Sequence, residues 1–244
     1  MPFTLAHAAA VLPLLRTRLT PSALVVGSMA PDLVYFALLR PVGGRFTHGP
    51  VGLLVLGLPL AVLVLVLWHA FTVHAFLAVA PAAVRARVGP VAPAPRPGVR
   101  VLASILVGAV THLLWDAFTH HDGYVVGWGP WLREDVWPTG LPAYEVLQLG
   151  GSAGGLAVLA WWGALWVRRT EPGVAGPGSW RARVVIGVVA VAFATGNALS
   201  ESGAAWVAPT LASIGLVTGA FLGLVGYGVA LRAGRVAAAR PGCR

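Results

Sequence analysis

The stretch VRVLASILVGAVTHLLWDAFTHHDG (residues 99–123) decides the fold class of this chain. Residues 99–119 form an apolar run close to the length of about 20 residues that crosses a bilayer as a helix. Near its end the run carries side chains that are costly to place near lipid, namely His112, Asp116, His120 and His121. Because residues four apart lie on one helix face, His112, Asp116 and His120 point to the same side. The stretch therefore predicts a transmembrane helix that presents metal-ligand side chains.

Composition places the whole chain in the membrane class. Of its 244 residues, 57% are hydrophobic and 10% are charged, and the mean hydropathy is +0.80, far from the balance of a soluble domain. The net charge of +9 comes from arginines between apolar runs, where membrane topology explains them. We therefore expect no nucleic-acid partner, and the sequence indicates no particular oligomeric state. The single cysteine, Cys243, excludes an internal disulfide and a thiolate metal site.

The apolar runs predict an all-α bundle of about five to six transmembrane helices, in a single integral membrane domain over residues 1–244. Besides 99–119, the predicted spans are residues 22–39, 51–79, 146–167 and 184–231, the last dividing into 184–200 and 206–231. A short helix over residues 5–16 is expected to pack against the bundle without crossing it. We expect residues 1–150 to form the half that carries the metal site and residues 151–244 to add C-terminal spans.

Loops and charges predict the orientation. Residues 92–100 and 168–183 combine Pro, Gly and Arg, and residues 120–142 are expected to be non-helical as well. Three arginine-rich regions should face the cytoplasm; they contain Arg85, Arg87, Arg96 and Arg100, then Arg168, Arg169, Arg181 and Arg183, then Arg232, Arg235, Arg240 and Arg244. The segments expected outside are 40–50, 120–142 and 201–205, with the acids Asp122, Glu134, Asp135 and Glu201. This orientation puts the C-terminus in the cytoplasm and the His/Asp stretch at the outer face.

Three other ionisable residues in the first fifty each have two interpretations. Asp32 follows Pro31 in an apolar context and is either a metal ligand or the N-cap of a helix that begins near Leu33. His48 starts the 51–79 span and is either a ligand or an interfacial histidine without a partner. His7 lies on the short apolar helix and is either a ligand or a core histidine with satisfied hydrogen bonds.

Later ionisable residues are weaker candidates. Glu145 has three interpretations, as a further ligand, as a general base, and as an interfacial carboxylate, which we favour. His69 and His74 lie towards the inner end of the 51–79 span, about 30 Å from His48 at helical rise. We interpret them as interfacial.

The order of these residues resembles a known group. His7, then GSMAPD with Asp32, THGPVG with His48, and HLLWDAFTHHDG are similar to bacterial membrane-bound metal-dependent hydrolases, which are inner-membrane relatives of the zinc-dependent phospholipase C and nuclease fold. The opening MPFTLAHAAAVLPLL also looks like an uncharacterised membrane family of the same layout. The resemblance covers about residues 1–150.

The resemblance implies a ligand set. By position, one zinc would be held by Asp32, His48, His112 and Asp116. His7 would share Asp116 in a neighbouring site, and His120 or His121 would belong to a third. The later H-x-x-x-E motif of that fold is missing, because no histidine follows His121, so one or two metal ions are expected, with Glu145 as a partial substitute.

The chemistry of these side chains also favours a metal-dependent hydrolase. Two carboxylates and several imidazoles suit Zn, Mn or Fe, and such an ion activates water and polarises a phosphoryl or acyl oxygen. We therefore expect a hydrolase that cleaves a phosphoester of a membrane lipid or lipid-linked substrate. One alternative is a non-catalytic membrane protein with a structural His/Asp cluster. A transporter is a third, disfavoured because the polar residues gather at one face and no paired broken helices are evident.

Overall fold

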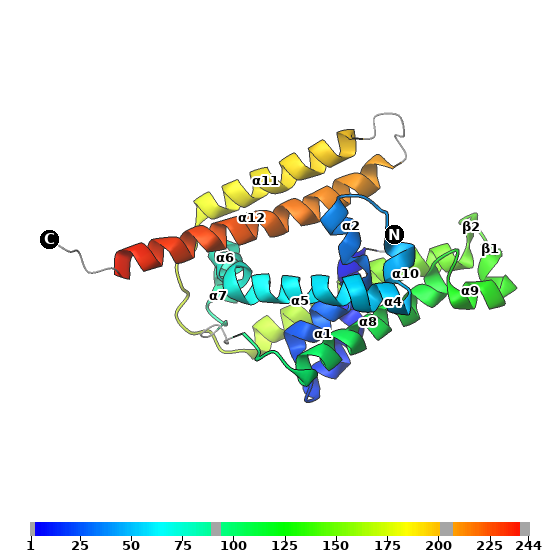
Figure 1. Ribbon diagram of the computed structural model, residues 1–244, viewed down its shortest axis with the longest axis horizontal. Helices are drawn as coiled ribbons and strands as arrows, with labels where there is room; N and C mark the ends of the chain where they lie inside the picture. Colours follow the sequence, from blue (N-terminus) through cyan, green and yellow to red (C-terminus); the bar gives the residue numbers. More distant parts are fainter. Residues whose placement is uncertain (1–2, 89–93, 201–206, 240–244) are drawn as a thin grey trace. The chain divides into compact units, whose positions relative to one another are not determined.

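A computed structural model describes residues 3–88, 94–200 and 207–239, with side chains through residue 234. The protein is 77% helical with almost no strand, which confirms the all-α class (Figure 1). The predicted outer segment 201–205 with Glu201, and the residues Arg240, Cys243 and Arg244, lie outside the described residues, as does the side chain of Arg235.

In the described part of the chain, four helical stretches are long and apolar enough to cross a membrane: Pro50–Val79, Val99–Trp128, Trp180–Leu199 and Ala208–Gly234. The pair Pro21–Gly27 and Ala30–Leu38, bent by 49°, makes a fifth if it counts as one span. The predicted span 146–167 is covered by helix α10 (Ala143–Arg169). This helix is long enough to cross but is not among the apolar candidates, because the glycine-rich GGSAGG segment (150–155) and its tryptophans lower its hydropathy.

The described residues form two compact units, and the first consists of those within Met1–Val34, Gly43–Val62 and Pro95–Leu165. Its helices before the 99–119 run are η1 (Thr4–Arg16), α1 (Pro21–Gly27), η2 (Ala30–Asp32), α3 (Gly44–Thr47), α4 (Pro50–Gly52) and the π-helical η3 (Leu53–Gly57). Then come α8 (Val99–Thr119), α9 (Tyr124–Trp128), η5 (Pro130–Arg133), the antiparallel strands β1 (Asp135–Val136) and β2 (Leu141–Pro142), and most of α10.

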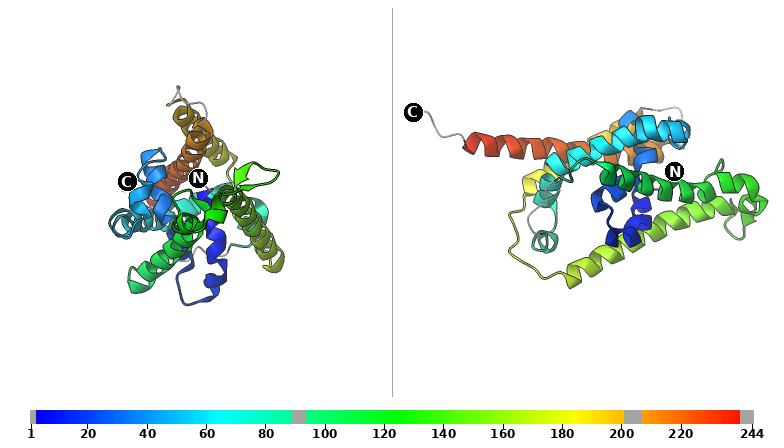
Figure 2. Two further views of the ribbon diagram at one scale, coloured as in Figure 1. Left: turned by 90° about the vertical axis from the view of Figure 1, so that its right-hand side faces the viewer. Right: turned by 60° about the horizontal axis from the view of Figure 1, so that its bottom comes forward.

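Close packing of α1 on α8 organises the first unit. A Cβ atom on Gly27 would overlap the backbone of Ile105, and one on Gly108 would overlap the backbone of Leu24. Glycine at both positions therefore lets the two helices approach at backbone distance, as small residues do in membrane bundles. Figure 2 shows η1, in blue, between α8 in green and α10 in yellow-green. This arrangement carries the end of α1 and the start of η1 to the polar half of α8.

Two local elements differ from the sequence prediction. The short N-terminal helix is present as η1, but with 3₁₀ rather than α geometry, and it contains Pro13. Residues 120–142, predicted to be non-helical, contain α9, η5 and the β1–β2 ladder, so this prediction was wrong in part. These short helices form because they bury Val126 and Leu132 completely, which offsets part of the cost of ordering the segment.

The second unit consists of the described residues within Tyr35–Val42, Leu63–Ala94 and Trp166–Arg244. It contains the π-helical η4 (Trp68–Thr72), α6 (Val73–Val79), α7 (Ala82–Arg85), α11 (Trp180–Leu199) and α12 (Ala208–Ala239). Helices α2 (Leu33–Leu38) and α5 (Leu58–Leu67) begin in the first unit and end in the second. Helices α11 and α12 lie side by side (Figure 1), where the buried Asn197 amide donates a hydrogen bond of 2.7 Å to the Leu211 carbonyl.

Candidate metal centre

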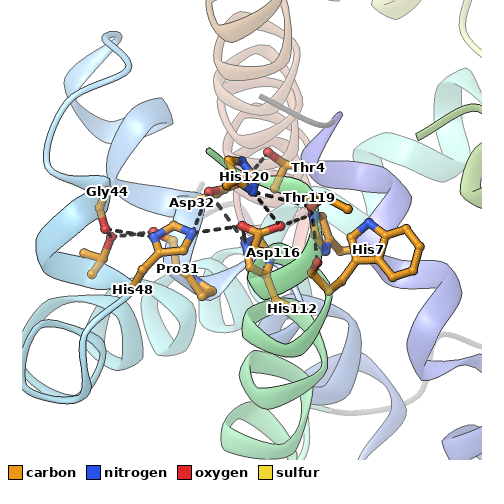
Figure 3. A network of polar contacts seen from close by, with 12 residues as sticks. Thr4, His7, Pro31, Asp32, Gly44, His48, His112, Asp116, Thr119 and His120 are labelled. Carbon is orange, nitrogen blue, oxygen red and sulfur yellow. Dashed lines mark hydrogen bonds and ion pairs between the residues drawn. The ribbon is translucent and has the colours of Figure 1, made fainter. Parts of the chain in front are cut away.

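Helix α8 supplies the two central side chains of a buried polar cluster. His112 is 0% exposed and Asp116 is 7% exposed, and their i, i+4 spacing puts Nε2 of His112 3.1 Å from Oδ2 of Asp116. Both residues fall within the candidate span Val99–Trp128, where a polar side chain facing lipid would be costly. The helix therefore turns them towards the interior of the first unit (Figure 3).

Backbone carbonyls orient two imidazoles in the same way. His112 uses Nδ1 to donate a hydrogen bond of 2.8 Å to the carbonyl of Ser28, directly after α1. His48, directly after α3, uses Nδ1 to donate a hydrogen bond of 2.8 Å to the carbonyl of Gly44. In the neutral ring, this bond leaves the lone pair on Nε2. Both Nε2 atoms face the cluster, which is how histidine ligands of metal ions are held.

Asp32 enters from the short η2 turn, where the sequence Ala-Pro-Asp interrupts the span. Its Oδ1 lies 3.6 Å from Nε2 of His48 and 3.7 Å from Nε2 of His112. Its Oδ2 accepts a hydrogen bond of 2.6 Å from the hydroxyl of Thr4. Because Thr47 donates a hydrogen bond of 2.6 Å to the Pro31 carbonyl, α3 is fixed beside this turn. Asp32 thus faces the histidines, in line with the ligand interpretation rather than the N-cap one.

His7 approaches the cluster from the opposite side. Its ring stacks on that of His112 with centroids 3.8 Å apart and an interplanar angle of 17°. Its Nε2 lies 3.6 Å from Oδ1 of Asp116. Burial, together with the neighbouring His112, lowers the pKa of His7 from 6.5 to about 3, so the ring is neutral at pH 7. His7 therefore has a lone pair and no positive charge at neutral pH.

The end of α8 separates His120 from His121. His120 directs Nδ1 towards Oδ1 of Asp116 at 3.5 Å, and the Gln148 amide donates a hydrogen bond of 3.2 Å to its Nε2. With Nε2 accepting, a neutral His120 carries its proton on Nδ1, so it faces Asp116 as a donor. His121 is exposed instead and lies edge-on to the Tyr144 ring at 6.0 Å. The structure brings His120 to the cluster and leaves His121 outside it.

One predicted participant, Glu145, remains apart from these contacts. Glu145 is half-buried in the first turn of α10, and none of the ion pairs between described residues involves it. His69 and His74, which the sequence did not predict as ligands, belong to neither group of potential metal ligands found among the described residues.

The residues present fit a bound cation. Three buried atoms of the cluster have no hydrogen-bond partner among the described residues: Nε2 of His7, Nε2 of His112 and Oδ1 of Asp116. Leaving such atoms unsatisfied costs about 1–3 kcal/mol each. The ligand atoms form two overlapping groups, each within 4.8 Å, namely His7–His112–Asp116 and Asp32–His48–His112. Since two carboxylates carry a charge of −2, a single divalent cation would neutralise the buried set.

One histidine is shared by the two groups, which limits how they can be filled. His112 appears in both groups, and its Nδ1 is engaged by the Ser28 carbonyl. Only Nε2 is left to bind an ion, and one lone pair serves one ion. His112 can therefore complete only one of the two groups at a time, with His7 on one side of it and Asp32 and His48 on the other.

Supporting residues were missed from the sequence. The carbonyls of Ser28 and Gly44 carry no side-chain signal, and any residue type supplies them. Thr4 and Gln148 did carry a signal. In a 3₁₀ helix, residues three apart eclipse each other, so Thr4 and His7 share a face of η1. Gln148 lies three residues after Glu145 on the first turns of α10, so it belongs to the same polar stretch at the start of that helix.

A helical chain with four candidate spans and a buried His/Asp cluster defines a polytopic membrane protein with a candidate metal centre. Comparison with protein families gives a match over residues 1–229 to the family described as a domain of unknown function, DUF4184. The chain belongs to that family. Comparison with curated proteins and with solved structures gave no match.

Proposed function

We propose that this protein is an integral membrane hydrolase that depends on a divalent metal ion, with zinc the expected ion, and cleaves a phosphoester in a lipid or lipid-linked substrate. The observation that carries the proposal is the face-to-face arrangement of acceptor atoms. Nε2 of His112 and Oδ2 of Asp116 lie 3.1 Å apart, yet His112 Nε2 makes no hydrogen bond within the described residues. The order of His7, Asp32, His48, His112 and Asp116 resembles membrane-bound metal-dependent hydrolases, which supports the same activity.

Each residue has a proposed role. His112 and Asp116 would hold the ion, with Asp32, His48 and His7 as the surrounding ligands. A divalent cation in such a set polarises a phosphoryl oxygen and lowers the pKa of a water molecule to about 7. Thr4 orients Asp32, and the carbonyls of Ser28 and Gly44 orient the two imidazoles. His120 would hold Asp116 in place through Nδ1.

Exposure indicates where a substrate approaches. The side chains of His48 and His120 are 25% and 29% exposed, whereas His112 and Asp32 are buried. A phosphoester would therefore reach the ion from the side of His48 and His120. We place this side at the extracytoplasmic end of α8, because the arginine-rich segments around residues 85–100 precede its other end. The exposed Trp128, Trp131 and Trp137 suit that interface.

The shape and lining of a cavity beside His7, called the groove below, favour a lipid substrate. A cavity of about 370 Å³ lies beside His7 and is lined by Ala6, Ala9, Trp115 and small residues of α10. This volume falls in the range of about 300–1,000 Å³ that accommodates organic ligands. Its lining is apolar apart from His7 and Ser152, which suits an acyl or polyprenyl chain. The phosphoester of such a substrate would then lie near the metal centre.

The decisive experiment measures metal content and hydrolysis together. Wild-type protein purified in detergent should contain stoichiometric divalent metal by plasma mass spectrometry and hydrolyse at least one of a panel of lipid phosphoesters. Asp116→Ala should lose both, whereas His121→Ala, which changes an exposed histidine outside the cluster, should lose neither. Absence of stoichiometric metal from the wild type would overturn the proposal. Metal without hydrolysis of any phosphoester would favour the structural alternative.

A further inference from the structure

A π-helical turn aligns two histidines in the second unit. In an α-helix, residues five apart point about 140° away from each other around the axis. Between His69 and His74, however, the helix has a π turn, η4, closed by the bond from the Val73 amide to the Trp68 carbonyl. Because this turn holds five residues, it brings positions 69 and 74 towards one face. Such turns are frequent at functional sites.

Helix α12 completes a pocket on that face. A cavity of about 260 Å³ is lined by His69, Ala70, His74, Gly228, Leu231 and Arg232. A Cβ atom on Gly228 would overlap the carbonyl of Phe71, so glycine here allows α12 to approach η4. The Arg232 guanidinium lies 5.8 Å from the centre of the Phe71 ring, which holds it beside the pocket.

The ionisable side chains that line the pocket are all basic. Its lining contains one guanidinium and two imidazoles and no carboxylate. Glu171 is the only acidic residue of the second unit within the described ranges, and it does not line the pocket. A positive pocket without an acidic side chain favours an anionic ligand, and guanidinium pairs well with phosphate oxygens.

The position of the pocket matches a membrane boundary. His74 lies near the C-terminal end of the candidate span Pro50–Val79, and Arg232 lies in the last turn of the candidate span Ala208–Gly234. Phosphate groups of lipids occur at this depth, and basic pockets between transmembrane helices bind anionic headgroups. The volume is slightly below the range of about 300–1,000 Å³ typical of larger organic ligands. The pocket is thus large enough for a phosphate group with a small substituent.

We propose that His69, His74 and Arg232 form a binding site for a phosphate group, distinct from the candidate metal centre and independent of its proposed function. The group belongs either to an anionic lipid headgroup or to a soluble phosphate compound. In this site Arg232 pairs with the phosphate oxygens, and the two histidines donate hydrogen bonds from their ring nitrogens.

Two arms of one experiment distinguish the sources. Full-length protein in detergent is titrated with phosphatidylglycerol, with phosphatidylcholine as the uncharged reference, and bound lipid is counted by native mass spectrometry. A parallel titration by calorimetry uses inorganic phosphate. The variants are Arg232→Gln and the double variant His69→Gln/His74→Gln. The matched control is Arg181→Gln, because Arg181 is also exposed and lies 5.7 Å from a ring, that of Trp180, outside the pocket.

Loss of the Arg232 charge should weaken binding of the preferred ligand about tenfold or more, since a charge-assisted hydrogen bond is lost. The double histidine variant should weaken it as well, and Arg181→Gln should bind like the wild type. Pocket-dependent binding of phosphatidylglycerol alone assigns a lipid headgroup, and pocket-dependent binding of inorganic phosphate assigns a soluble ligand. Binding of neither probe, or equal binding by Arg232→Gln and wild type, overturns the proposal. Because Arg232 is exposed, its variant decides the matter even if the histidine variant does not fold.

Discussion

Oδ2 of Asp116 lies 3.1 Å from Nε2 of His112, one turn earlier on α8, while Nδ1 of the same ring donates to the Ser28 carbonyl. In the neutral ring, a lone pair therefore faces a carboxylate oxygen in a site where both residues are buried. Two acceptors at this separation repel each other unless a proton or a cation lies between them. A divalent cation satisfies both atoms and also balances the charge of Asp32.

Metal stoichiometry should follow from the shared role of His112. Because its single free lone pair belongs to both donor groups, we expect one tightly bound ion per chain in the wild type. His112→Ala should lose stoichiometric metal. His7→Ala and His48→Ala should each keep the ion but bind it less tightly, since the remaining donors still surround it. Metal analysis with a competing chelator measures both quantities, and two tightly bound ions per wild-type chain would contradict the expectation of one ion.

Thr4 should matter without touching the ion. Its hydroxyl donates to Oδ2 of Asp32 at 2.6 Å and so leaves Oδ1 facing the histidines. Removing such an outer partner typically lowers metal affinity about 10–100-fold, so Thr4→Val, which keeps the shape of the side chain, should show a loss of that size in a chelator competition titration. Thr17→Val is the control, because Thr17 is exposed just after the other end of η1. Its hydroxyl donates to the Leu14 carbonyl and accepts from the Leu19 amide, both close in sequence and outside the cluster. Equal affinity in the two variants would refute the role of Thr4.

The sequence predicted the side chains of the cluster better than their supports. The span 99–119 coincides with α8, because a continuous apolar run ends at the polar His-His-Asp-Gly sequence. The i, i+4 rule then placed His112 and Asp116 on one face. Periodicity placed His120 on the same face but could not exclude His121, because the helix ends at Thr119 and the next residues leave its geometry. The carbonyls of Ser28 and Gly44 could not be predicted, since every residue has one and only tertiary packing selects which is used.

Close packing of α1 on α8 should be sensitive to a single methyl group. Gly108→Ala would place Cβ against the backbone of Leu24, which cannot move as a flexible side chain does. Overpacking of this kind costs about 1–3 kcal/mol, so the unfolding temperature in detergent should fall. Gly150→Ala on α10 is the control, because a Cβ atom there meets no atom within 4 Å. A Gly108→Ala protein as stable as Gly150→Ala would mean that the helices do not approach at backbone distance.

On the proposed hydrolase function, filling the groove should lower hydrolysis of lipid substrates but not hydrolysis of small soluble ones. Gly154 lines the cavity beside His7, and a Cβ atom at this position has no neighbour within 4 Å. Gly154→Leu therefore fills part of the groove, and its Cβ atom meets no residue of the metal cluster. We expect hydrolysis of a lipid phosphoester to fall about tenfold or more, since blocking burial of several methylene groups removes about 0.8 kcal/mol for each. Hydrolysis of a small water-soluble phosphodiester, and the metal content, should remain at wild-type levels. Gly150→Leu provides the matched control, as it adds the same side chain to α10 outside the groove. Equal losses on lipid and soluble substrates in Gly154→Leu would show that the groove does not bind the lipid chain.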